Sequence, residues 1–154
     1  MSLNKIIIGF IIILLIFSGI IVFQLNNSSL PKSKVTIDKH TFSTETATTS
    51  AQQQQGLSGR ASLPQNQGML FIFKTAQPYP FWMNDMKFPL DMIFINDNKI
   101  VDIFQNVPQP KNSNEKLPIY TPSASANQVL ELNAGISKAY GFKKGDTVSV
   151  SLSK

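Results

Sequence analysis

The sequence predicts a mainly β domain, a compact β-sandwich or partly closed barrel with one or two short helices, preceded by an N-terminal transmembrane helix. Three features of the 154 residues lead to this prediction. A long apolar run lies near the N-terminus, and the rest of the chain alternates apolar segments of strand length with turn residues. Helical periodicity is scarce outside the apolar run, as expected for an all-β architecture.

The apolar run occupies residues 6–23, IIIGFIIILLIFSGIIVF, and contains no charged side chain. As a helix it would extend about 27 Å and nearly span the hydrocarbon core of a bilayer. A cleavable signal peptide would have a shorter apolar region that ends in small residues. We therefore expect an uncleaved signal anchor over residues 1–24 and a linker over residues 25–33. Lysines lie on both sides of the run and do not fix its orientation.

The similarity to export signals and the short leading tail favour a single-pass protein of the cell membrane with an extracytoplasmic domain. We expect this domain to cover residues 34–154. Its first strands should lie at residues 35–37 and 41–47, which are rich in threonine and β-branched side chains. Thr49 and Gly56 flank SAQQQQ as helix caps, which predicts one short helix. The glutamine run could instead be a low-complexity linker.

Apolar segments predict the remaining strands, at residues 69–73, 81–83, 91–95, 100–104, 128–132 and 147–152. The segments MLFIF (69–73) and MIFI (92–95) are apolar at every position, so we expect both faces of these strands to be covered. The sequence NDNK at residues 96–99 indicates a hairpin turn. Three prolines between residues 107 and 118 indicate a longer exposed loop.

Composition excludes several classes of function. The chain has no cysteine, which excludes disulfides, thiolate nucleophiles and cysteine-based zinc sites. The net charge of +5 is scattered rather than gathered into a basic stripe, so we do not expect a nucleic-acid partner. The only histidine, His40, lies in an exposed-looking turn, and hydrolase or metal-binding motifs are missing. We therefore predict no catalytic residue, metal or cofactor, and the sequence does not indicate an oligomeric state.

Three acidic residues lie in unusually apolar surroundings. Asp85 follows Asn84, a pair typical of a turn. Asp91 opens the strand DMIFI, where burying its carboxylate would cost several kcal/mol unless a cation or hydrogen-bond donors met it. Glu131 lies within VLEL, and strand alternation places it on the same face as Val129. Asp91 and Glu131 therefore both require a partner.

The single arginine of the chain, Arg60, is the candidate partner, because a guanidinium can bridge buried carboxylates in bidentate fashion. We hypothesise that Arg60 pairs with Glu131, Asp91 or both. Such a cluster would either pin the short helix to the sheet or form the floor of a pocket with Trp82 as one wall, and both interpretations stay open. A group of aromatic residues could form a stacking platform for a ligand, but such residues more often belong to the core, as we expect for Tyr79, Phe81, Trp82 and Phe88. Only for Trp82 do both roles stay possible.

Several short motifs together resemble the Domain of Unknown Function 192 family, also called uncharacterised protein family 0127. They are Gly56-Leu57 followed by Arg60, GMLF at 68–71, FWM at 81–83, PLD at 89–91, VLE at 129–131 and GD at 145–146. The resemblance extends from about Val35 to the C-terminus. It implies a small β-rich, sandwich-like fold, often behind an export signal or membrane anchor, and no established reaction. It supplies no catalytic residue, and the loop before Tyr120 lacks cysteines that some relatives carry.

Three functional hypotheses follow. The first is a membrane-tethered domain that binds an envelope polymer or envelope protein through Arg60, Trp82, Asp91 and Glu131. The second is an envelope glycan hydrolase in which two of Asp85, Asp91 and Glu131 act as acid and base across a cleft. The third is a non-catalytic accessory that assists assembly or stability.

Overall fold

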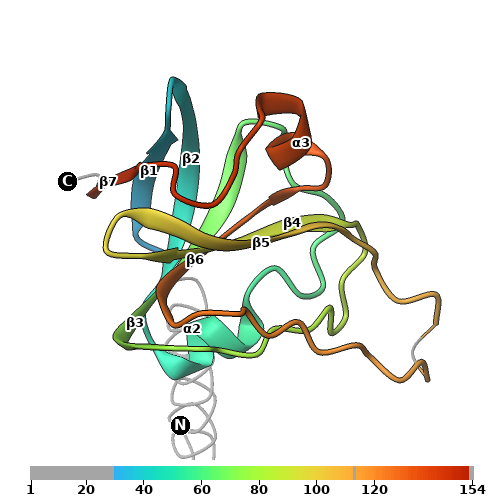
Figure 1. Ribbon diagram of the computed structural model, residues 1–154. Helices are drawn as coiled ribbons and strands as arrows, with labels where there is room; N and C mark the ends of the chain where they lie inside the picture. The colour runs from blue at the N-terminus through green and yellow to red at the C-terminus, as the bar shows by residue number, and fades with distance from the viewer. Residues whose placement is uncertain (1–29, 113, 153–154) are drawn as a thin grey trace, which may run out of the picture. The chain divides into compact units, whose positions relative to one another are not determined.

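Seven strands form one mixed sheet in the computed structural model, which describes residues 30–112 and 114–152. The strands are β1 (Lys32–Ile37), β2 (His40–Ala47), β3 (Gln67–Gln77), β4 (Leu90–Asn96), β5 (Lys99–Val107), β6 (Ala126–Asn133) and β7 (Val148–Leu152). They lie in the order β5-β4-β6-β3-β2-β1-β7 (Figure 1). The β2–β3 pair is parallel and all other pairs are antiparallel.

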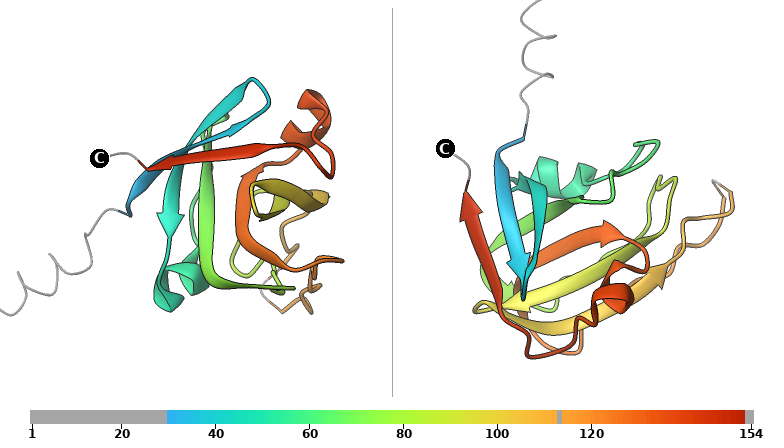
Figure 2. Two further views of the ribbon diagram at one scale, coloured as in Figure 1. Left: turned by 60° about the vertical axis from the view of Figure 1, so that its left-hand side comes forward. Right: turned by 90° about the horizontal axis from the view of Figure 1, so that it is seen from above.

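The sheet curls until its two ends meet. Thr147, directly before β7, forms a β-bridge with Lys99 at the start of β5. The Val148 N–H of β7 donates to the carbonyl oxygen of Asn98 in the β4–β5 turn at 2.9 Å. Figure 2 shows the resulting curled half-barrel. Asp97 and Asn98 both have positive φ, which forms the tight hairpin expected from NDNK. The prediction of a mainly β fold with short helices is confirmed.

The two short helices pack on opposite faces of the sheet (Figure 1). Helix α2 (Ser50–Gln55) has the expected caps, with Thr49 and Gln52 exchanging side-chain and backbone hydrogen bonds. At its other end Gly56 has φ +48, and a Cβ there would lie 3.2 Å from the Phe71 ring. The sequence allowed for a second short helix but gave no position for it, and the structure shows it as α3 (Ile136–Tyr140).

One expected strand does not form. Within residues 81–83 only Phe81 makes a β-bridge, to Tyr120. Pro80 precedes this segment and Asp85 has φ 52, so turn geometry on both sides leaves too little extended chain for a strand. The segment instead crosses over the outside of the sheet.

The main core lies on the inner face of the curled sheet. We call inner the face whose side chains form the large cluster of buried hydrophobic residues. All seven strands and α3 border this cluster, and its members include Val35, Leu70, Ile93, Leu130 and Val148. Strands β3 and β4 are also apolar on their outer face, where Met69, Phe71, Met92 and Phe94 are buried. Coverage of both faces of these two strands is therefore as predicted.

Residues 1–29 lie outside the described residues, and with them the expected membrane anchor and most of the expected linker. Strand β1 begins at Lys32, two residues before the expected start of the domain. Within residues 30–112 and 114–152, no helix has the length and apolar character needed to cross a membrane.

Asp91 of β4 connects its own strand to the end of β5 and the start of α3 through hydrogen bonds on the inner face. Its fully buried carboxylate accepts hydrogen bonds from the backbone N–H groups of Asn106 at 2.8 Å, Gly135 at 3.0 Å and Ser137 at 2.7 Å. These donors belong to the end of β5 and the start of α3. Hydrogen bonds to an ionised acceptor are stronger than neutral ones, so this carboxylate stabilises both segments.

We predict that Asp91→Asn lowers the free energy of unfolding by about 2 to 4 kcal/mol, because the amide cannot accept all of these hydrogen bonds. Urea denaturation measures the change. The matched control is Asp97→Asn in the exposed hairpin turn, which should change stability by less than about 0.5 kcal/mol. Equal effects of the two substitutions would contradict the structural role of Asp91.

Candidate functional site

A row of paired residues crosses the outer face of the sheet and contains two glutamates. Glu45 pairs with Met69, Met69 with Glu131, and Glu131 with Met92. Side chains of directly paired residues point to the same face, so the Glu131 carboxyl lies between two buried methionines. This agrees with the expectation that Glu131 shares its face with apolar side chains.

Glu131 has only 5% of its surface exposed, and no hydrogen-bond donor or cation among the described residues reaches its carboxyl group. Burial raises the pKa of Glu131 to about 8, because an ionised carboxylate is poorly solvated there. The carboxyl group is therefore mainly protonated at neutral pH. A strongly perturbed pKa makes a residue a candidate for a functional site when the residue also lies in a cleft.

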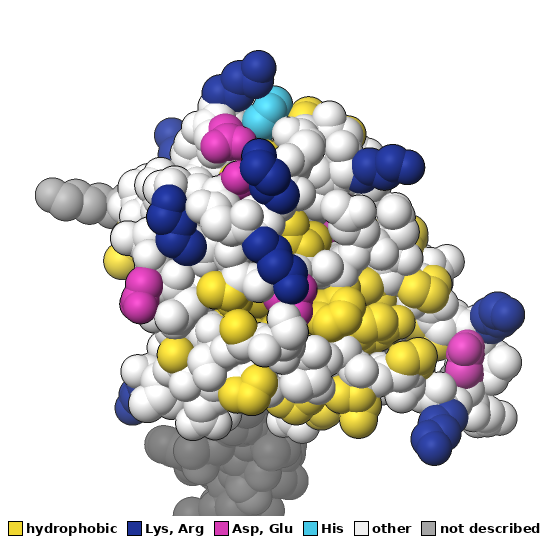
Figure 3. Space-filling view, viewed as in Figure 1, with side chains coloured by type: hydrophobic (Ala, Val, Ile, Leu, Met, Phe, Trp, Pro, Cys, Tyr) yellow, Lys and Arg dark blue, Asp and Glu magenta, His cyan; other side chains and the backbone are white. Residues whose placement is uncertain are grey.

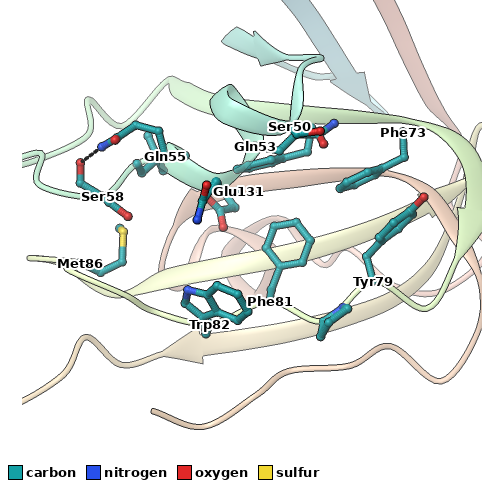
Figure 4. Close-up of a pocket in the computed structure, with 15 residues that line it drawn as sticks. Ser50, Gln53, Gln55, Ser58, Phe73, Tyr79, Phe81, Trp82, Met86 and Glu131 are labelled. Carbon is teal, nitrogen blue, oxygen red and sulfur yellow. Dashed lines mark hydrogen bonds between the residues drawn. The ribbon is translucent and has the colours of Figure 1, made fainter. Parts of the chain in front are cut away.

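Glu131 does face a cavity, of about 390 Å³, which lies between α2 and the segment that crosses the outer face. Cavities of this size accommodate small organic ligands. Figure 4 shows Glu131 between Gln53 of α2 and the ring of Trp82. The lining residues are Ser50, Gln53, Gln54, Gln55, Gly56, Leu57, Ser58, Phe71, Phe73, Tyr79, Pro80, Phe81, Trp82, Met86 and Glu131.

Aromatic rings form one wall of this cavity. Tyr79 stacks on Phe73 with ring centroids 3.8 Å apart, and Phe81 packs edge-on against Phe71 at 5.1 Å. Trp82 is 50% exposed and forms the rim. The expectation that this aromatic group is mainly core is wrong, because none of its rings is fully buried and three of them line the cavity.

Three polar side chains of the lining donate hydrogen bonds to backbone carbonyl oxygens. The Gln53 amide nitrogen donates to the carbonyl oxygen of Ile72 at 2.8 Å, and that of Gln55 donates to the carbonyl oxygen of Ser58 at 3.1 Å. The Ser58 hydroxyl donates to the carbonyl oxygen of Asn84 at 2.7 Å. These bonds fix α2 and its C-terminal turn over the sheet, so the cavity is preformed.

Arg60 does not pair with Glu131 or Asp91, which corrects the sequence-based hypothesis. Its guanidinium contacts the Glu45 carboxylate at 2.5 Å, and about a third of each side chain is exposed. Glu45 and Glu131 lie on the same face but two strands apart, or about 10 Å between backbones. Arg60 therefore neutralises the nearer glutamate and does not line the cavity.

Asp91 and Glu131 cannot form one site because they point to opposite faces of the sheet. Glu131 pairs with Met92, and Asp91 pairs with Leu132, a member of the inner core. Alternation along the strands then separates the two carboxyl groups. Of the four predicted site residues, the structure brings together Trp82 and Glu131, and leaves Arg60 and Asp91 in structural contacts.

The carboxylate pair required by the hydrolase hypothesis does not assemble in this cavity. Asp85 lies in an exposed turn with φ 52 and pairs with Lys87 at 2.6 Å, as its turn interpretation implied. Among the residues that line the cavity, Glu131 is the only acid. Two acids that could act on one substrate are therefore not found together around it.

Sequence reasoning missed the contribution of α2, which supplies Ser50, Gln53, Gln54 and Gln55 to the lining. The predicted helix was correct, but nothing indicated which part of the sheet it would cover. The nearest signal was Gly56, whose lack of a side chain lets the helix end closely approach Phe71.

We predict that the stability of the domain depends on the protonation of Glu131. The pKa in the folded state, about 8, exceeds the ordinary value of 4.5, so the folded state binds more protons between these values. Stability from this group is complete below about pH 4.5 and is lost as the pH rises through about 8, with a total of several kcal/mol.

Urea denaturation of the unaltered chain, Glu131→Gln and the control Glu45→Gln across this range checks the prediction. The Glu131→Gln variant should lose this component of the pH dependence, and Glu45→Gln should keep it. A pH dependence that survives in Glu131→Gln would show that another group is responsible.

Comparisons with known proteins agree with the family that the motifs indicated. The model of the family DUF192, described as Uncharacterized ACR, matches residues 33–150. A solved structure from Sinorhizobium meliloti 1021, proposed to be a transcription regulator, is 33% identical to this chain, with a TM-score of 0.73. The match covers 80% of this chain and 97% of that one. A protein of unknown function from Novosphingobium aromaticivorans DSM 12444 is 32% identical with a TM-score of 0.66, over 77% of this chain and 83% of its own. No curated protein matches. This chain is a member of the DUF192 family.

Proposed function

We propose that the domain is a binding module that holds a small organic group in the cavity above Glu131. The observation that carries this proposal is the buried carboxyl group, which has no partner among the described residues and faces a preformed cavity. A polar group that is shielded from bulk water and has no partner in the protein needs an explanation, and a ligand in the cavity would supply one. Trp82 and Glu131 are the residues that would contact the ligand.

Binding is favoured over hydrolysis because general acid–base cleavage of a glycoside uses two carboxyl groups. The lining contains only one, while Asp85 and Asp91 are engaged elsewhere. The half-exposed Trp82 at the rim and the stacked Tyr79 offer flat apolar surface instead. Aromatic faces next to convergent polar groups are typical of ligand sites.

The proposed setting is outside the cytoplasm, with residues 6–23 as a membrane anchor and an envelope polymer or envelope protein as the source of the bound group. Support comes from the uncharged apolar run of 18 residues, which as a helix would nearly span the hydrocarbon core of a bilayer. One relative is proposed to be a transcription regulator. The face shown in Figure 3 lacks the gathered positive charge that would favour nucleic-acid binding by this chain. Lys and Arg side chains there are spread singly, while hydrophobic side chains gather in the lower half.

Trp82 is the only tryptophan of the chain, so its fluorescence reports directly on the cavity. We predict that soluble muropeptides shift the Trp82 emission of the full chain in a saturable manner. Tyr79→Ala should weaken binding about fivefold, since an aromatic contact contributes about 1 kcal/mol.

Tyr140→Ala is the matched control, because Tyr140 also stacks on a ring at 3.8 Å, that of His40, but does not line the cavity. It should bind as the unaltered chain does. The absence of any saturable change with muropeptides, or equal losses in both variants, would contradict the proposed site.

We further predict that the full chain fractionates with membranes and resists extraction by carbonate, because an apolar helix is held by the hydrocarbon core. Protease added to cells with a permeabilised outer wall should remove the domain, if it lies outside. Replacing four of the apolar residues, Ile11, Ile13, Leu15 and Ile20, by aspartate should release the chain. Recovery of the unaltered chain in the soluble fraction would refute the anchor.

A further inference from the structure

The side chains that line the cavity include a carboxylic acid and no basic group. Its lining contains the Glu131 carboxyl group and neither lysine nor arginine. Arg60, the partner expected from the sequence, is already paired with Glu45, which lies two strands away from Glu131. A positively charged ligand would therefore find its counter-charge in Glu131 and meet no like charge in the lining.

Hydrogen-bond donors of the lining are partly used. Gln53 and Gln55 each direct their amide nitrogen to a backbone carbonyl oxygen, and the Ser58 hydroxyl does the same. An amide whose nitrogen is held in this way presents its oxygen in the other direction. Because the two glutamines and the carboxyl group of Glu131 line one cavity, its polar groups favour a ligand that donates hydrogen bonds.

The aromatic wall points to a cation as well. Ring faces attract cations because their electron density is negative above the plane, and tryptophan does so most strongly. Trp82 and Phe81 lie on the side of the cavity opposite Gln53, with Glu131 between them (Figure 4). A cation above Glu131 would thus meet a carboxyl group and ring faces together.

We propose that the ligand group is a primary ammonium on a short alkyl chain, bound with its charge at Glu131 and its chain along the aromatic wall. This inference rests on the proposed function, since it names the chemistry of the group held in the same cavity. A bare metal ion fits less well, because calcium or magnesium takes about six or more oxygen ligands and the described residues contain no cluster of three acidic or metal-binding side chains.

Binding of an ammonium group must be coupled to loss of a proton, because the free carboxyl group is mainly protonated at neutral pH. Affinity should rise about tenfold per pH unit below about pH 8 and level off above it. Tyr79 is the other titratable group in the lining. The facing residues of α2, β3 and β4 carry no charge, and the Glu45–Arg60 pair lies outside the lining.

The test is a titration of the full chain with n-butylammonium, followed by Trp82 fluorescence, in an uncharged polyoxyethylene detergent. The isosteric probes n-butanol and butyrate are titrated in parallel. We expect saturable binding of butylammonium, at least tenfold weaker binding of both other probes, and release of close to one proton per ligand at about pH 6.5, counted in a pH-stat.

Glu131→Gln should weaken butylammonium binding at least tenfold and abolish proton release, while the control Glu45→Gln should leave both unchanged. Near-ultraviolet circular dichroism shows whether each variant is folded. Should Glu131→Gln fail to fold, proton release and the pH dependence of the unaltered chain still test the inference.

Equal binding of butanol and butylammonium would overturn the inference and leave the proposed function intact. So would binding of butylammonium without proton release. If muropeptides bind but butylammonium does not, the ligand is of another class and the inference is again wrong. If no probe of either experiment changes Trp82 emission, the proposed function fails together with it.

Discussion

The site depends on a carboxyl group that the fold buries without giving it a cation or a hydrogen-bond donor as partner. Glu131 occupies the middle of a cross-strand row, with Met69 and Met92 on either side and α2 above it. Desolvation raises its pKa to about 8, so the domain keeps a proton that an exposed glutamate would release. Such a group is tolerable inside a fold while it stays neutral, and it becomes a strong partner for a ligand that replaces the proton. Under the proposed function, the cavity above it would provide the space for that exchange.

The second constraint is alternation along the strands, which gives the two buried acids different tasks. On the inner face Asp91 meets three backbone N–H groups, and its charge holds the end of β5 and the start of α3. On the outer face Glu131 meets side chains of low polarity. One residue of difference in the β4–β6 register therefore separates a hydrogen-bonded structural carboxylate from a carboxyl group that faces the cavity.

Much of the fold was predictable because its signals are local. Strand-length apolar segments, the Thr49 and Gly56 caps and the NDNK turn each act over a few residues, and the structure contains the elements that they indicate, apart from the strand expected at residues 81–83. The other failures concern contacts between distant segments. The partner of Arg60 depends on β2 lying beside β3 in parallel, which is a property of the sheet order. The aromatic residues were assigned to the core because composition cannot tell a ring that fills space from one that borders a cavity.

The most direct test of this account is a nuclear magnetic resonance titration of the Glu131 side-chain carboxyl carbon, with Glu131→Gln used to assign the signal. The account predicts that this carbon titrates near pH 8 in the free domain. A midpoint close to the ordinary glutamate value of 4.5 would mean that water or an unseen donor solvates the group, and would contradict the claim that its burial is uncompensated.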